Sequence, residues 1–204
     1  SCKKIFEQRG HVCFGISPFN SFFSEATIQK LASWGRSQFE AMHFFVPDIP
    51  SAFTLEALGY SPEKASWKAR RQCQYLSNKI IRALNSLGID VVQANEMVIG
   101  WEALSANARY AQIHEETLNE FENNSEFRLQ CLEATKWVLD KRVPDTADLS
   151  NTALLHAVRY LLAEIPMFID TAGVLGLASS VFCYHQSVPF LENLYERRLA
   201  VKPR

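Results

Sequence analysis

Short apolar runs and long amphipathic stretches alternate along the first half of the chain. Residues 11–16 (HVCFGI) and 39–46 (FEAMHFFV) are nearly continuous apolar runs, which are typical of strands buried on both faces of a sheet. Helical periodicity follows each run, over residues 24–34 and 62–87. A further apolar run at 89–94 predicts a third strand.

The second half of the chain is mainly helical in its pattern. From 103 to 164 the apolar positions recur at helical spacing, with breaks expected near Asn123 and Pro144. Strand character returns at 179–184 (SSVFCY), and a short final helix is expected at 188–195. Alternating strands and helices predict an α/β fold, in which helices cover both faces of a central, mostly parallel sheet.

Composition limits the class of protein. The 204 residues are 48% hydrophobic and 21% charged, with a net charge of −1, which excludes wholesale disorder. This length suits one domain, which we expect to span residues 1–204. No uninterrupted apolar stretch reaches the ~18 residues that cross a bilayer, and the N-terminal residues lack the apolar core of a signal peptide. We therefore expect a cytoplasmic protein with no membrane partner.

The cysteines and histidines do not have the spacing of a metal site. The five cysteines are odd in number and form no C-x-x-C pair, and no histidine lies three or four residues from another. These spacings argue against a disulfide framework and against structural zinc. We expect neither a metal nor a cofactor, and we expect a monomer because no exposed apolar heptad seam is visible.

The helix expected at 62–87 has a strongly basic face. At 100° per residue, five of its six cations and Tyr75 share a stripe about 80° wide and about 27 Å long, opposite an apolar face. One interpretation is a solvated helix face. The other is a ridge that contacts RNA phosphates, which is no less supported because no carboxylate within the stripe relieves the repulsion between the cations. The six basic residues are Lys64, Lys68, Arg70, Arg71, Lys79 and Arg82.

Ser17 follows the first expected strand, at the edge where parallel sheets usually carry their sites. The segment GISPF at 15–19 begins like the G-x-S-x-G elbow of serine hydrolases, but Phe19 replaces the second glycine and no Asp–His pair completes a triad. Ser17 also suits the cap of a helical turn that starts at Pro18, which is a common use of Ser-Pro and is favoured on these residues alone. The residues alone leave both interpretations open.

Two further polar groups occur in apolar surroundings. Tyr160 and Glu164 are four residues apart on an expected helix, so they share one face. A buried carboxylate needs a cation or a hydrogen-bond donor, which is either a substrate ammonium or an intramolecular partner such as Arg159. Tyr184 and His185 end the last expected strand and form a third candidate group.

Three blocks, taken in order, resemble the cyclodipeptide synthase family. They are GISPFNS at 15–21, YLLAEIP at 160–166 and CYH at 183–185, with the basic helix between the first two. Asn20, with the tyrosine and histidine of the third block, resembles the subgroup named for Asn, Tyr and His. The resemblance covers nearly the whole chain and implies a Rossmann-like fold similar to the catalytic core of class I aminoacyl-tRNA synthetases.

The resemblance also implies an activity. The family joins two amino acids taken from two aminoacyl-tRNAs and releases a cyclic dipeptide, a 2,5-diketopiperazine. The chain has no H-I-G-H or K-M-S-K-S block, which fits an enzyme that uses tRNA esters rather than ATP. In the implied ping-pong scheme Ser17 carries first an aminoacyl and then a dipeptidyl group, and Tyr160 with Glu164 binds the first ammonium.

The remaining residue roles come from the resemblance as well. Tyr184 would relay a proton at cyclisation, while Asn20 and His185 would position the backbone and the nucleophile. An apolar pocket for the first amino acid would be edged by four residues that equally suit a core, namely Cys13, Gly15, Met167 and Phe182. Two other functions stay open: an RNA-binding domain without catalysis, in which Ser17 is only a cap, and a serine esterase on an α/β fold.

Overall fold

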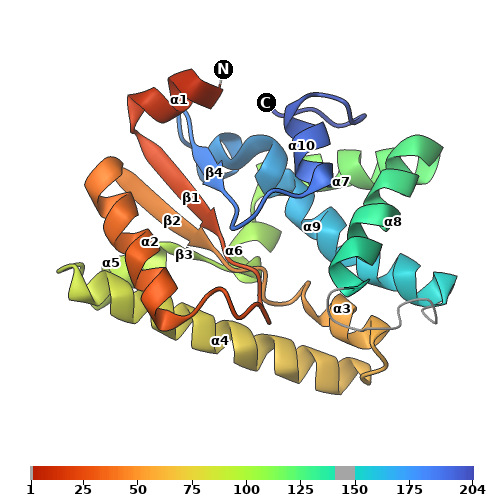
Figure 1. Cartoon of the computed structure of the whole chain (residues 1–204), viewed down its shortest axis with the longest axis horizontal. Helices are drawn as coiled ribbons and strands as arrows, with labels where there is room; N and C mark the ends of the chain where they lie inside the picture. Colours follow the sequence, from red (N-terminus) through yellow and green to blue (C-terminus); the bar gives the residue numbers. More distant parts are fainter. Residues whose placement is uncertain (1, 141–149) are drawn as a thin grey trace.

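The computed structural model describes residues 2–140 and 150–204. At its centre is a four-stranded sheet with the strand order β3-β2-β1-β4, in which every pairing is parallel (Figure 1). The strands are β1 (His11–Gly15), β2 (Ala41–Phe45), β3 (Val98–Ile99) and β4 (Val181–Cys183). The predicted α/β class with a Rossmann-like parallel sheet is confirmed.

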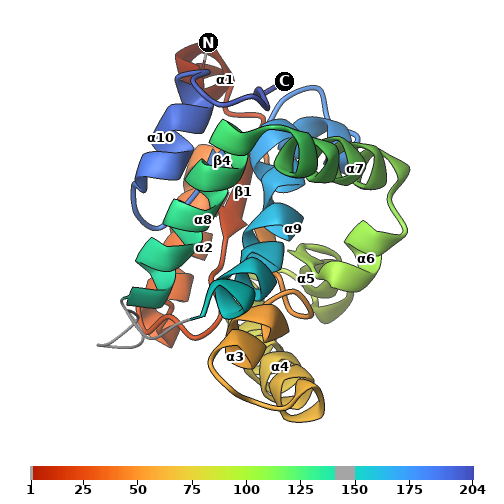
Figure 2. The same ribbon diagram turned by 90° about the vertical axis from the view of Figure 1, so that its right-hand side faces the viewer.

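Helices cover both faces of the sheet (Figure 2), and each face has its own hydrophobic core. Side chains alternate along β1, so Val12 and Phe14 belong to one core and Cys13 to the other. The first core is covered by α2 (Glu25–Gln38), α4 (Pro62–Ser86) and α5 (Val91–Glu96). The second is covered by α6 (Trp101–Ser105), α7 (Ala108–Asn123), α8 (Ser125–Asp140), α9 (Asn151–Leu175) and α10 (Pro189–Tyr195).

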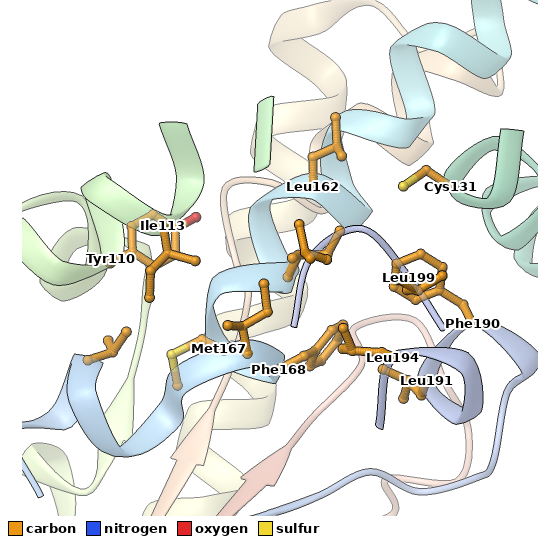
Figure 3. Close-up of a cluster of buried hydrophobic side chains, with 14 of the residues drawn as sticks. Tyr110, Ile113, Cys131, Leu162, Met167, Phe168, Phe190, Leu191, Leu194 and Leu199 are labelled. Carbon is orange, nitrogen blue, oxygen red and sulfur yellow. The ribbon is translucent and has the colours of Figure 1, made fainter. Parts of the chain in front are cut away.

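Helix α9 is the centre of the second core. Leu162, Met167 and Phe168 of α9 pack with side chains of α7, α8 and α10 (Figure 3). Among the described helices α9 alone has the length and apolarity to cross a membrane, but 56% of its most apolar window is buried within the protein. Its apolar sequence is therefore that of a core helix.

Helix α2 begins where the sequence predicts and ends later. Ser24 caps it by accepting a hydrogen bond from the backbone of Thr27, but the helix continues through Gly35 to Gln38. A Cβ at Gly35 would lie 2.7 Å from Met42 Sδ and 3.0 Å from the Phe14 ring. This glycine thus serves close packing of α2 on the sheet rather than a stop.

The prediction of a strand at 89–94 is wrong. Asp90 accepts hydrogen bonds from the backbone of Val92 and Gln93, and this cap begins α5 instead. The third strand is the two-residue β3, which follows α5. Two short helices, α1 (Cys2–Gln8) and α3 (Ala52–Ala57), were not predicted.

The predicted breaks in the helical half have two outcomes. Helix α7 ends at Asn123, and the side chain of Asn124 accepts a hydrogen bond from the backbone of Phe127 in α8, so the first break is confirmed. The break near Pro144 lies outside the described residues. Strand β4 and helix α10 fall within the ranges expected for them.

Candidate active site

A cavity of about 300 Å³ lies at the carboxyl ends of β1 and β4. Ser17, Tyr160, Glu164 and Tyr184 all line it, although they come from three distant parts of the sequence. Helices α3, α8, α9 and α10 supply most of the rest of the wall, which is mainly apolar and includes Phe168. The fold therefore gathers the predicted nucleophile, the carboxylate and both phenols around one space.

Ser17 and Tyr184 are hydrogen-bonded to each other. Their oxygen atoms lie 2.7 Å apart, and only 7% of the Ser17 surface is exposed. The approach depends on Gly15, because a Cβ there would lie 2.7 Å from Phe182 Cζ and 3.1 Å from Tyr184 Cδ2. The parallel pairing of β1 with β4 thus delivers a serine hydroxyl and a phenol to the same point.

The loop after β1 is a strained turn and not the start of a helix. Phe19 has a φ of 61°, in the left-handed region that bulky residues avoid, at the position of the second glycine of the elbow motif. No helix begins until α2, which has its own cap at Ser24. The interpretation of Ser17 as a helix cap is therefore wrong, because no helix follows it directly.

Glu164 is a buried acid in the wall of the cavity. It is 6% exposed and lies one helical turn from Tyr160 on α9. Burial, together with the charge of Glu164, raises the pKa of Tyr110, whose hydroxyl donates to the carbonyl of Ala163 at 2.7 Å. A carboxylate in such a position is suited to hold a cationic group that enters the cavity.

Asn20 and His185 join the loop after β1 to the segment after β4. Asn20 Nδ2 donates to His185 Nε2 at 2.8 Å, and Asn20 Oδ1 accepts from the backbone of Phe22 at 3.0 Å. The imidazole also packs against Phe22 and Phe23, with ring centroids 5.6 and 5.3 Å away. Neither Asn20 nor His185 is among the residues that line the cavity.

A family model described as cyclodipeptide synthase matches residues 1–204. The chain belongs to the cyclodipeptide synthase family. Its relatives include a cyclo(L-tyrosyl-L-tyrosyl) synthase of Mycobacterium tuberculosis, 32% identical over 196 residues that cover 96% of this chain and 67% of the relative. A cyclo(L-leucyl-L-leucyl) synthase of Bacillus subtilis is 31% identical over 190 residues, covering 91% of this chain and 75% of the relative.

Solved cyclodipeptide synthases share the fold. The structure of one from Bacillus thermoamylovorans superposes with a TM-score of 0.90 at 28% identity, covering all of this chain and 88% of the other. The Mycobacterium tuberculosis structure has a TM-score of 0.84 at 30% identity, covering 100% of this chain and 85% of that one. That structure is described as demonstrating that cyclodipeptide synthetases are related to type I tRNA synthetases, which agrees with the Rossmann-like sheet found here.

The four residues expected around the first amino-acid pocket lie behind the cavity wall in this family member. Cys13 and Met167 are fully buried, and burial raises the pKa of the Cys13 thiol. Phe182 packs edge-on against Phe168, which does line the cavity, with centroids 5.3 Å apart. None of Cys13, Gly15, Met167 and Phe182 is among the lining residues. Cys13 and Met167 belong instead to the same hydrophobic core as Phe168.

Sequence reasoning missed one side of the cavity. Helix α8 contributes Gln130, Glu133 and Trp137, and the segment after β4 contributes Gln186. The α8 residues recur at i, i+3 and i+7, so they share one face, but this polar-aromatic spacing alone resembles an ordinary amphipathic helix. Thr54, on the unpredicted helix α3, also lines the cavity.

The basic residues predicted to bind RNA lie together on α4, at the edge of the molecule (Figure 1). The stripe is less uniformly cationic than its own sequence indicates, because Arg82 forms a salt bridge of 3.0 Å with Glu25 of α2. This arginine lowers the pKa of the Glu25 carboxyl. Lys64 and Lys68 lie over the ring of Tyr60, with Nζ atoms 5.4 and 5.2 Å from its centroid. Arg70 is exposed but off the stripe.

Proposed function

We propose that this protein is a tRNA-dependent cyclodipeptide synthase, an aminoacyltransferase that takes two amino acids from two aminoacyl-tRNAs and releases a 2,5-diketopiperazine. The observation that carries the proposal is the shared cavity, lined by Ser17, Tyr160, Glu164 and Tyr184. Family membership and the names of the relatives support the same activity. The match of Asn20, Tyr184 and His185 supports a place in the Asn-Tyr-His subgroup.

In the first step the aminoacyl group of the first substrate is transferred to Ser17. Its Oγ attacks the carbonyl carbon of the first aminoacyl ester, the bond from that carbon to the ribose oxygen breaks, and the serine proton passes to the released ribose oxygen. An aminoacyl ester is already activated, so the reaction does not need the Asp–His pair that the chain lacks. The ammonium of the bound residue would lie against Glu164 and Tyr160, which share one face of α9.

Two amide-forming steps follow. The first residue's ammonium gives a proton to Glu164, and the resulting amine attacks the carbonyl carbon of the second aminoacyl ester. The ribose oxygen leaves with one of the two amine protons, the other stays on the new amide, and Ser17 now carries a dipeptidyl group. The second residue's amine then attacks the Ser17 ester. Tyr184 gives its phenolic proton to Ser17 Oγ as that bond breaks, and takes one from the amine. One cavity that holds all reacting groups supplies the effective concentration these steps need.

The RNA substrate and the side chains it delivers are also part of the proposal. The stripe on α4 would bind tRNA phosphates, at a helix that packs on α3 and hence beside the cavity wall. An apolar wall that includes Leu161, Phe168 and Phe190 favours hydrophobic amino acids. The relatives named for cyclo(L-leucyl-L-leucyl) and cyclo(L-leucyl-L-phenylalanyl) products support this choice.

One experiment separates the proposal from its rivals. Purified protein is incubated with charged tRNAs, and diketopiperazines are sought by mass spectrometry. A radiolabelled aminoacyl group should remain on wild-type protein after gel filtration, and on the Ser21→Ala control, but not on Ser17→Ala. Ser21 lies in the same loop and is exposed, so its loss should leave the chemistry intact. RNA binding without product would favour a non-catalytic protein, and hydrolysis of simple esters without tRNA would favour an esterase.

A further inference from the structure

Two aromatic side chains stand exposed on the most basic helix of the protein. Trp67 and Tyr75 of α4 are 56% and 50% exposed, more than any other aromatic side chain in the described part of the chain. They are eight residues apart, two steps along an i, i+4 row of the helix, so their positions are about 12 Å apart along the axis and about 80° apart around it. Their exposure is not explained by packing within the protein.

Arg71 lies between the two rings. Its guanidinium carbon is 5.0 Å from the centroid of Trp67 and 5.6 Å from that of Tyr75, and its nitrogen atoms donate to the Tyr75 hydroxyl at 3.1 and 3.2 Å. These contacts hold the arginine against both rings, so the three side chains form one ordered strip. The strip offers two flat apolar faces and a fixed positive charge.

The strip also lies on a continuous route to the nucleophile. Lys68 and Lys64, about one and two turns before Arg71, both lie over the ring of Tyr60. Tyr60 packs with Phe19 against one small buried cluster, and Phe19 is two residues from Ser17. A polyanion whose end reaches Ser17 can therefore run out over cations and aromatic rings along α4.

We propose that Trp67 and Tyr75 stack unpaired nucleobases of the single-stranded 3′ end of the tRNA substrate, while Arg71 between them contacts the phosphate chain. Exposed aromatic rings interleaved with cations are the usual means of binding single-stranded nucleic acid, because every base has a flat face. Double-stranded RNA offers phosphates but few accessible base faces, so it would use the cations and not the rings. This inference rests on the proposed use of aminoacyl-tRNA.

Binding is tested with two uncharged RNA hairpins that mimic an acceptor stem, one with an unpaired 3′ extension and one blunt. Trp67→Leu and Tyr75→Leu should each weaken binding of the extended hairpin about fivefold or more and leave the blunt hairpin unaffected. The dependence of affinity on salt should be unchanged in both variants, because no charge is lost. Arg71→Gln should weaken both hairpins and reduce the salt dependence.

Matched variants separate ring stacking from helix damage. Trp67→Phe keeps a ring and should bind the extended hairpin like wild type, as should Val92→Ala, which trims a 72% exposed apolar residue on α5. Unchanged affinity of the Leu variants for the extended hairpin, or an equal loss on the blunt one, would overturn the inference. The hairpins carry no ester, so these results do not depend on turnover. Absence of diketopiperazine from charged tRNA would instead overturn the proposed function.

Discussion

The hydroxyl oxygens of Ser17 and Tyr184 lie 2.7 Å apart although 167 positions separate them in the chain. The contact is a direct product of strand order, because β4 pairs with β1 rather than with a sequence neighbour. Any acyl group on Ser17 therefore has a phenol within hydrogen-bonding reach of the bond that must break.

Replacing Tyr184 by Phe should separate the two halves of the reaction. The ring and its packing on Phe168 are kept, so acylation of Ser17 should proceed, whereas release of the cyclic product should fall by about a hundredfold or more. Labelled protein and diketopiperazine are measured in the same reaction. Equal loss of labelled protein and product would contradict a role confined to cyclisation.

Glu164→Gln tests the charge of the buried acid at nearly constant volume. Without the carboxylate the incoming ammonium loses its counter-charge, so labelling of Ser17 should slow by about tenfold or more. The readout is the rate of aminoacyl-enzyme formation at several concentrations of charged tRNA. Glu126→Gln, on the exposed first turn of α8, is the matched control and should label normally. Normal labelling of Glu164→Gln would remove this residue from substrate binding.

Gly15→Ala should damage both folding and catalysis. The added methyl meets Phe182 and Tyr184, so we expect unfolding to become easier by about 1–3 kcal/mol and the Ser17–Tyr184 contact to be displaced. Gly10→Ala is the control, since nothing lies within 4 Å of a Cβ there. Adding Phe182→Leu to Gly15→Ala should recover part of the stability in urea unfolding. If Gly15→Ala were as stable and active as Gly10→Ala, the close approach would not matter.

A pair of histidines at the other end of the sheet should make stability sensitive to acid. His11 Nε2 lies 2.8 Å from His43 Nδ1, and burial, with His43 as the second cause, lowers the pKa of His11 to about 4. In the unfolded chain the imidazole of His11 has its ordinary pKa near 6.5, so between pH 6.5 and 4 it is protonated in the unfolded chain but not in the folded protein. Stability should therefore fall by up to about 3 kcal/mol as the pH drops from 6.5 to 4.

The measurement is urea unfolding at pH 7 and at pH 4.5 for wild type and His11→Asn. The variant is expected to be less stable at pH 7, because it loses a buried ring, but to lose less on acidification. An equal acid-induced loss in both proteins would show that His11 is not responsible.

The cations of α4 should contribute unequally to RNA binding. Arg82 is neutralised by Glu25, whereas Lys68 has no ion pair within 4 Å among the described residues. Lys68→Gln should thus lower the slope of log affinity for tRNA against log salt by about 0.7 to 0.9. The double variant Glu25→Gln with Arg82→Gln removes a neutral pair and should leave that slope unchanged. Equal slopes for Lys68→Gln and wild type would show that Lys68 does not contact RNA phosphates and lies on an ordinary solvated helix face.

Regular patterns in the sequence predicted the parts of the fold that depend on local periodicity. The run HVCFGI became β1, and Ser24 and Asn123 mark true helix boundaries. The run at 89–94 misled because its apolar residues are shared between the core and an exposed turn: Ile89 is 6% exposed but Val92 is 72% exposed. The capping side chain of Asp90 outweighs β-propensity there.

The candidate site, like the fold, was predicted from the sequence only in part. Polar side chains that interrupt apolar sequence, such as Ser17 and Glu164, could be picked out from the sequence as candidates, and both line the cavity. Gln130 and Trp137 were not, because their contribution depends on how α8 docks against α9, which is a tertiary contact without a local signature. At Gly35 a tertiary contact was mistaken for a local signal. The sequence predicted that this glycine ends the helix, whereas it allows the helix to pack closely on the sheet.

The pairing of β4 with β1 determines when, during synthesis of the chain, Ser17 and Tyr184 can meet. A ribosome makes Ser17 among the first residues of this chain and Tyr184 among the last, and only the docking of the final strand against the central one brings them together. Charged tRNA is abundant around a translating ribosome, but a nascent chain that stops short of β4 cannot form the contact between Ser17 and Tyr184. On the proposed mechanism, such a chain could be acylated on Ser17 but could not release a cyclic product.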